Sequence, residues 1–188
     1  MALDRLLCLG RDLAPLLPPA GARTSVLSVP DAARPYLVAA LADLGHGRPV
    51  VAVTPTQADA EHLSHDIAAF LGNEGVVTFP AWETLPFERV SPAVETMGRR
   101  LEAVWRLRHD PPKVLVAAVR ALVQRLGPHV EDAEPVLVRP GDRLDLEALL
   151  GRLVRMGYRR EHQVEHRGEV AVRGSIVDVY PSTGDVPV

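Results

Sequence analysis

Two histidines, His62 and His65, have the spacing of a possible metal site. They fall in a stretch with helical periodicity, where side chains at positions i and i+3 lie on the same face. Imidazole nitrogens bind zinc well, but a zinc site needs further ligands, and the sequence identifies no distant partner for this pair. Because acidic residues flank the pair, a solvated helix face is the favoured interpretation. A metal-dependent enzyme built on this pair is retained as a minor hypothesis.

The loop after the first predicted strand is where an α/β nucleotide motor would hold a triphosphate. Such a loop reads Gly-x-x-x-x-Gly-Lys-Ser/Thr, because its glycines let backbone amides face the phosphates and its lysine reaches the terminal ones. Residues 29–35 instead read Val-Pro-Asp-Ala-Ala-Arg-Pro, and the carboxylate of Asp31 would repel an anion. Lys113, the only lysine, lies outside any glycine-rich loop. We therefore expect no ATP hydrolysis by this chain, no bound cofactor and no metal.

No other catalytic constellation is indicated. Ser175 follows a glycine but lacks the second glycine of a nucleophile elbow, so it is interpreted as an ordinary residue at the start of a strand. The remaining histidines considered are scattered over a predicted linker and a predicted hairpin: His129, His162 and His166. No catalytic residue is assigned.

Composition points to a cytoplasmic protein of one medium domain or one domain with a small appendage. The 188 residues are 47% hydrophobic, enough to bury a core, and the net charge of −3 argues against bulk attraction to DNA. Cys8 is the only cysteine, which excludes an internal disulfide and a cysteine-rich zinc cluster. Neither a secretory signal nor a run long enough to cross a membrane is recognised.

Strand and helix patterns alternate along the first two thirds of the chain. Short apolar runs typical of buried strands separate segments of helical spacing, several of which end at glycines. This alternation implies parallel crossovers, hence an α/β domain at residues 1–126 with both faces of its sheet covered. The expected strands are 23–29, 49–53, 76–79 and 113–118; the expected helices are 31–44, capped by Asp31 with Pro35 in its first turn, 56–71, 91–108 and a short one ending at 126.

A small α+β domain is expected at residues 127–188, after an acidic linker. Its predicted helix, 144–156, carries a leucine-rich stripe, and a brief strand precedes it at 136–139. Strands 158–166 and 169–172 are predicted to pair as an antiparallel hairpin turned at 167–168, followed by a strand at 176–180. The sequence stops soon after with no closing element, which favours a fragment of a longer protein.

The predicted hairpin region is rich in arginine. The guanidinium fork suits carboxylate partners, and arginines beside an aromatic residue are typical of protein interfaces, with Tyr158 and Tyr180 as the available aromatics. Arg159 and Glu161 should point to one side of the strand, and Arg160 and His162 to the other. The alternative is a solvated hairpin whose arginines pair with nearby glutamates. The arginines of this region are Arg152, Arg155, Arg159, Arg160, Arg167 and Arg173.

DNA contact is a weaker interpretation of two other groups of residues. Trp82 and Trp105 could stack on bases, but their apolar neighbours favour core packing. Four arginines of the longest predicted helix could touch phosphate, although charged residues spread around a helix mostly face solvent or neighbouring acids. These arginines are Arg99, Arg100, Arg106 and Arg108.

Several motifs together resemble the amino-terminal module of the bacterial transcription-repair coupling factors, the Mfd family. They include Phe79-Pro-Ala-Trp-Glu-Thr-Leu-Pro86, Ser91-Pro92, Gly157-Tyr-Arg159 and Val172-Arg-Gly174 through Asp178-Val-Tyr-Pro181, and the resemblance covers almost the whole chain. It implies a fold similar to the first two domains of the damage-recognition subunit UvrB, a degenerate P-loop-motor-like sheet without the nucleotide loop. The DNA-clasping β-hairpin of UvrB is also missing.

The resemblance implies a non-catalytic adaptor whose second domain binds the repair protein UvrA. By position, the contact residues are Arg159 or Arg160 together with Arg173, while Ala171 stands where UvrB-like sequences carry a further arginine. In the intact family member, other domains bind RNA polymerase and DNA, a motor using ATP and magnesium translocates on DNA, and a distant domain masks the UvrA-binding face. The alternative is a DNA-binding module retaining a UvrB-like groove.

Overall fold

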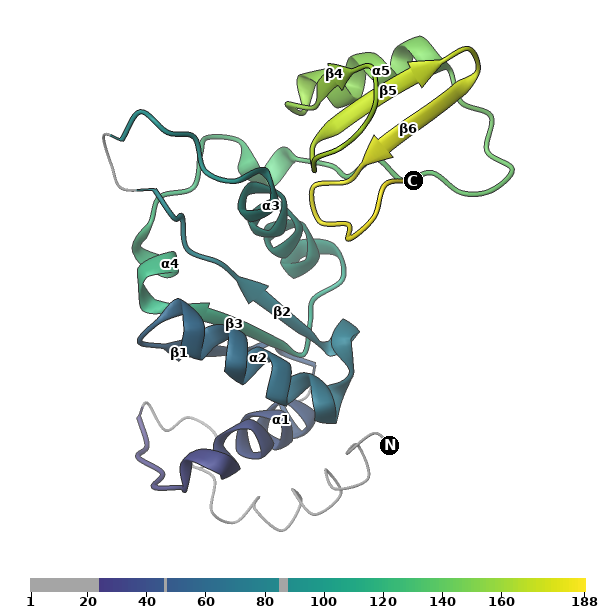
Figure 1. The fold of residues 1–188 in the computed structure, drawn as a ribbon. Helices are drawn as coiled ribbons and strands as arrows, with labels where there is room; N and C mark the ends of the chain where they lie inside the picture. Colours follow the sequence, from purple (N-terminus) through teal and green to yellow (C-terminus); the bar gives the residue numbers. More distant parts are fainter. Residues whose placement is uncertain (1–23, 46, 85–87) are drawn as a thin grey trace. The chain divides into compact units, whose positions relative to one another are not determined.

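The computed structural model describes residues 24–45, 47–84 and 88–188. The fold divides into two compact units: unit 1 is residues 1–81 with 103–127, and unit 2 is residues 82–102 with 128–188 (Figure 1). The sequence pattern predicts one boundary, after residue 126. In the structure, residues 82–102 group with the carboxy-terminal part of the chain.

Unit 1 contains a three-stranded parallel sheet. Its strands are β1 (Val50–Thr54), β2 (Val76–Phe79) and β3 (Val114–Ala118), in the order β1-β3-β2. Val114 is the register partner of both Val50 and Val76, so β3 is the central strand. This confirms the predicted α/β class, and the three strands agree with the sequence pattern.

The central strand of unit 1 contributes to two apolar clusters because its side chains alternate between the faces of the sheet. Val114 and Val116 join a cluster with Ile67 of α2 (Gln57–Leu71), and Tyr36 of α1 (Arg34–Leu44) packs against it, its ring edge-on to Phe70. Leu115 and Ala117 belong to the second cluster. Its other members are Val77, Phe79, Ala103 of α3 (Val94–His109) and Ala121 of α4 (Val119–Val123).

The helices of unit 1 begin and end close to the predicted residues. The Thr56 side chain accepts a hydrogen bond of 3.1 Å from the Asp59 amide, and Gly72, with φ +77°, closes α2. A 3-10 turn, η2 (Asp31–Ala33), leads into α1, where Pro35 lies in the first turn as predicted. Asp31 does not cap the helix; its carboxylate instead pairs with Arg34 at 2.7 Å. Another 3-10 turn, η3 (Asn73–Gly75), precedes β2.

The first predicted strand, 23–29, is wrong over the residues that the structure describes, 24–29. These residues form no ladder, and Val26 is 92% exposed. Their β-branched pattern favours extended backbone, but a strand also needs a neighbour, and β1 pairs with β3 only among the described strands. Arg23 lies outside the described residues.

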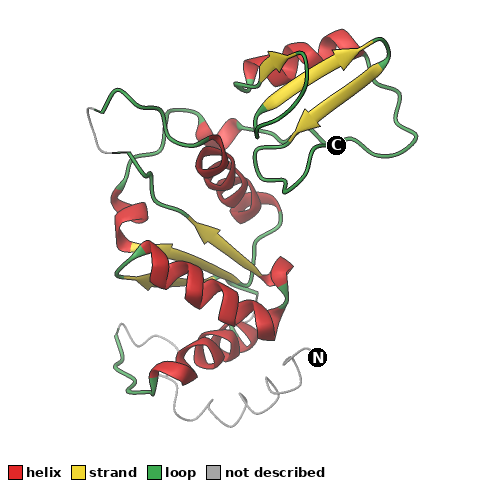
Figure 2. Ribbon diagram, viewed as in Figure 1, coloured by secondary structure: helices red, strands yellow, loops and turns green. Residues whose placement is uncertain are grey.

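Unit 2 holds a second three-stranded sheet and one helix of its own (Figure 2). A 3-10 turn, η4 (Val130–Asp132), is followed by α5 (Leu146–Arg155), which begins where the Asp145 carboxylate accepts hydrogen bonds from two backbone amides. The strands are β4 (Arg159–Glu161), β5 (Glu169–Arg173) and β6 (Ile176–Tyr180), in the order β4-β5-β6. The strand predicted at 136–139 is wrong, since these residues form no ladder.

The hairpin predicted between 158–166 and 169–172 is also wrong. β4 is only three residues long and pairs with β5 in parallel; the antiparallel hairpin is β5–β6, turned at Gly174. The path of residues 162–168 explains the parallel pairing. The buried carboxylate of Glu169 accepts hydrogen bonds of 2.9 Å from the Glu165 amide and 2.8 Å from the His166 amide, folding this segment back to the start of β4.

The first half of α3 packs within unit 2. A Cβ added at Gly98 would lie 2.7 Å from the Cβ of Ser182, and one at Gly168 would lie 2.7 Å from the Val94 side chain. Glycine is therefore needed at both positions for close approach. No helix in the described part of the chain has the length and apolarity required to cross a bilayer.

Candidate docking face

The strand register of unit 2 assigns the candidate arginines to opposite faces of the sheet. Residues paired across strands share a face, as do residues two apart along one strand. Arg159 pairs with Glu169, which pairs with Tyr180, and further along β5 Arg173 pairs with Ile176. We call this side the docking face and define it by Arg159, Glu161, Glu169, Ala171, Arg173, Ile176, Asp178 and Tyr180.

Arg160 lies on the opposite face. Its register partner is Val170, and the other strand residues on that side are also valines: Val172, Val177 and Val179. The sheet therefore has one apolar side and one charged side. Of the two adjacent arginines that the sequence could not separate, Arg159 is the one that shares a face with Arg173.

The two arginines of the docking face are exposed and weakly paired. Arg159 is 69% exposed and its guanidinium lies 3.9 Å from the Glu169 carboxylate. Arg173 is 62% exposed and lies 3.3 Å from the Asp178 carboxylate. Arg159 lies beside Glu169, its register partner, and Arg173 lies four residues further along β5. At the usual rise of a strand this is a separation of roughly 13 Å along the sheet. Exposed guanidinium groups at this spacing can bind two carboxylates of a partner.

Glu169 is the buried carboxylate beneath the docking face. The backbone amides of Glu165 and His166 donate to it, and these hydrogen bonds hold its pKa below the ordinary value of about 4.5. Burial acts in the opposite direction, while the electrostatic interactions with His166 and Arg159 also lower the pKa. The Glu169 carboxylate holds segment 162–168 in place through these hydrogen bonds. It also lies near the Arg159 guanidinium and so orients that side chain. Sequence reasoning missed this role, although a glutamate beginning an apolar strand run, Glu169-Val-Ala-Val172, was the available signal.

The two candidate tyrosines are used mainly to hold the turn after β6. The Tyr158 hydroxyl oxygen accepts a hydrogen bond of 3.1 Å from the Ser182 amide. The Tyr180 hydroxyl donates to the Asp185 carbonyl at 3.0 Å, and the Arg167 guanidinium lies 5.9 Å above its ring. Both rings are half-buried. Tyr180 lies on the docking face, and Tyr158 precedes β4.

Other arginines of this segment stabilise the fold. The Arg167 guanidinium donates to the Glu95 carboxylate at 2.6 Å, to the Gly184 carbonyl at 2.7 Å and to the Asp185 carboxylate at 3.0 Å. Arg152 donates to two carbonyls of the preceding loop. The arginine-rich composition thus combines internal clamps with exposed side chains, a division that the sequence does not reveal.

The arginines and tryptophans around α3 follow the sequence expectations only in part. Arg100 is buried rather than solvated: it is 2% exposed, its guanidinium lies 4.4 Å above the Trp82 ring, and burial lowers its pKa. The Arg106 side chain is only 12% exposed and donates to the Glu74 carbonyl at 2.7 Å. Arg99 pairs with Glu95 at 2.6 Å, while Arg108 is exposed. Trp82 and Trp105 are both half-buried, and Trp105 stacks on His109.

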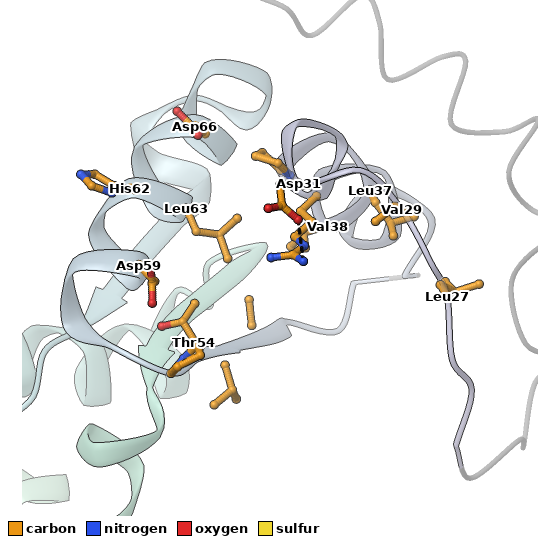
Figure 3. A pocket seen from close by; sticks show the side chains of 15 residues that line it. Leu27, Val29, Asp31, Leu37, Val38, Thr54, Asp59, His62, Leu63 and Asp66 are labelled. Carbon is orange, nitrogen blue, oxygen red and sulfur yellow. Dashed lines mark ion pairs between the residues drawn. The ribbon is translucent and has the colours of Figure 1, made fainter.

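Unit 1 has a cavity of about 690 Å³ between the start of α1, the end of β1 and α2 (Figure 3). Its polar lining is mostly acidic, with Asp31, Asp59 and Asp66 against Arg34, which already pairs with Asp31. His62 is among the lining residues, whereas His65 is not. Within the described residues, no group of three or more His, Cys, Asp or Glu side chains could hold a metal ion.

The scattered residues considered for catalysis are not brought into one site. Ser175 is exposed in the β5–β6 turn. His129 lies 3.4 Å from Asp132, and His166 lies 3.5 Å from Glu169, while His162 is exposed after β4. None of these contacts joins a nucleophile to a general base.

Comparison with known proteins gives matches to both parts of the chain. Residues 136–188 match the family model of the UvrB interaction domain. A transcription-repair-coupling factor of Mycobacterium tuberculosis is 38% identical over 182 residues, 92% of this chain and 14% of the relative. Those of Myxococcus xanthus and Escherichia coli are 36% and 34% identical, over 90% and 80% of this chain and 15% and 13% of their own lengths. The chain thus spans about one seventh of these relatives.

Proposed function

Because the chain belongs to the transcription-repair-coupling factors, as a UvrB-like module of that family, we propose that it is a non-catalytic adaptor that recruits UvrA. The docking face of unit 2 is the binding surface, and Arg159 and Arg173 are its charged contacts. The observation that supports this proposal most directly is the strand register, in which these two exposed arginines lie on one side of a single sheet.

The geometry supports arginine-to-carboxylate recognition of another protein. The guanidinium of Arg173 lies near one carboxylate of its own chain at 3.3 Å, and that of Arg159 lies at 3.9 Å, so each is oriented but keeps donors for a partner. Such complementarity governs orientation and association rate, while desolvated contacts govern residence time. An acidic surface of UvrA is the matching partner.

The charge of the cavity in unit 1 supports the non-catalytic part of the proposal. Three carboxylates line the space at the carboxyl end of β1, and the one arginine of that lining is paired. A triphosphate in this space would face repulsion with no lysine to offset it. ATP turnover by the purified chain would contradict this part of the proposal.

Calorimetric titration with UvrA tests the docking face directly. Arg159→Ala and Arg173→Ala should each cost about 2 kcal/mol or more of binding free energy, roughly 30-fold in Kd. Arg160→Ala is the matched control, because it removes the same charge from the neighbouring residue on the opposite face. It should leave the Kd within about twofold.

The melting temperatures of all three variants should stay close to that of the wild type, since each removed arginine is exposed. Equal losses for Arg159→Ala and Arg160→Ala would instead indicate long-range attraction and reject a defined docking face. DNA binding that falls steeply as salt rises would support the alternative, a module with a UvrB-like groove.

The role of the intact protein follows as an extension of the same proposal. Most of a relative's length lies beyond the region matched by this chain. We assign RNA polymerase binding, DNA binding and ATP-driven translocation with magnesium to those other parts, together with a distant domain that masks the docking face. The adaptor then links stalled transcription to nucleotide excision repair.

A further inference from the structure

Ile176 is an exposed apolar side chain on the docking face. It is 63% exposed, it begins β6, and its register partner is Arg173. Among the residues of β4, β5 and β6, all of which the structure describes, it is the exposed large hydrophobic one. The charged side of the sheet therefore presents an exposed apolar side chain, Ile176, beside the exposed Arg173.

The tyrosines do not fill this role, because the fold already uses them. Tyr158 and Tyr180 bond to the turn at residues 182–185 and are half-buried. Tyr180 also lies in the row of Glu169, at the opposite end of the sheet from Ile176. The apolar surface available beside Arg173 is therefore aliphatic.

The position of Ile176 suits a binding anchor. An isoleucine has few side-chain rotamers in a strand, so little conformational entropy is lost when it is bound. Arg173 beside it is oriented by Asp178 at 3.3 Å. Burying the isoleucine would exclude water from the Arg173 guanidinium, and charge-assisted hydrogen bonds are stronger where water is excluded.

We propose, resting on the docking function above, that Ile176 is the apolar anchor of the docking face. Its binding partner presents an apolar pocket with a carboxylate at the edge nearest Arg173. The arginines then determine orientation, and the isoleucine determines how long the complex lasts.

Binding kinetics with UvrA test the anchor. Ile176→Ala should weaken binding about tenfold, mostly through faster dissociation. Ile176→Thr keeps the β-branched shape that favours a strand but makes the side chain polar, so it should weaken binding without loss of β6. Val186→Ala is the matched control: Val186 is 65% exposed in the same unit, is not on the docking face, and its variant should leave the Kd within about twofold.

The salt dependence of binding distinguishes the contribution of Ile176 from that of the arginines. The loss caused by Ile176→Ala should be the same at low and high salt, whereas the loss caused by Arg173→Ala should shrink as salt rises. If wild type binds UvrA and the arginine variants lose affinity, but both Ile176 variants bind within about twofold of wild type, the anchor is overturned and the docking face stands. If wild type does not bind UvrA, the proposed function itself fails, and the anchor with it.

Discussion

The two sheets of this protein have the same number of strands but differ in the exposure of their faces. In unit 1 the central strand, β3, is buried along its whole length and contributes to an apolar cluster on each face. In unit 2 one side of the sheet is apolar, while the other carries arginines, carboxylates and one exposed isoleucine. The sheet of unit 1 is thus buried on both faces at its central strand, although Val51 and Val53 of the edge strand β1 are about half exposed. Such a sheet is suited to be a scaffold, whereas one with a charged side can bind a partner.

The polar groups of the two units differ in sign as well as in exposure. The cavity in unit 1 has acidic walls, while the docking face of unit 2 exposes guanidinium groups above a buried glutamate. If the assignment of scaffold and binding surface is correct, substitutions in the core of unit 1 should lower stability without weakening binding. Substitutions of its exposed residues Arg159, Arg173 and Ile176 should instead weaken binding without lowering stability.

The largest effect is expected from Ile67→Ala in unit 1. Ile67 is fully buried in the cluster around β3, so its truncation leaves a cavity and should cost about 2–5 kcal/mol of the free energy of unfolding. Urea unfolding measures this cost. At a temperature where the variant remains folded, its affinity for UvrA should be unchanged; a parallel loss of affinity would remove the distinction between the two units.

A smaller effect is expected from Gly98→Ala in unit 2. The added Cβ would approach Ser182, so the turn after β6 must shift, and overpacking of this kind costs about 1–3 kcal/mol. Gly151→Ala on α5 is the matched control, because the nearest atom to its Cβ is the end of the flexible Arg155 side chain at 3.4 Å. Thermal unfolding should show a lower melting temperature for Gly98→Ala only. Equal melting temperatures would mean that α3 and the turn do not pack closely.

The smallest change is the pH dependence caused by Glu169. Since its pKa is lower in the folded protein, the ionised group adds stability above its ordinary value of about 4.5, and this contribution is lost as pH falls through the folded pKa. Glu169→Gln should therefore be less stable than wild type at pH 7, with the difference shrinking below about pH 4.5. Unfolding curves for both proteins between pH 3 and 7 measure this difference. A constant difference would exclude the carboxylate charge as its source.

Most elements could be predicted from the sequence because their signals are local. Thr56 and Asp59 mark the start of α2, Gly72 marks its end, and the apolar run at 114–118 predicts a buried strand. Such features need no knowledge of the chain's path, so they agree with the structure closely.

The errors in the predicted strands concern the pairing between strands. Residues 24–29 have the pattern of a strand but no neighbour, and β4 pairs in parallel where a hairpin is predicted. Both outcomes depend on contacts made by other parts of the chain. For β4 the decisive contact is the Glu169 carboxylate, which captures two amides of the connecting segment.

The sequence by itself determined that a mixed α/β fold would form, that its usual phosphate-binding loop is missing, and that arginines gather between residues 152 and 173. Only the tertiary structure decided which of those arginines are clamps and which are exposed together. The physical reason is that the alternation of side chains along one strand assigns them to two faces of that strand. It does not say which residues of the neighbouring strand lie on the same face of the sheet. Register supplies that information, and it joins Arg159 to Arg173 and Ile176.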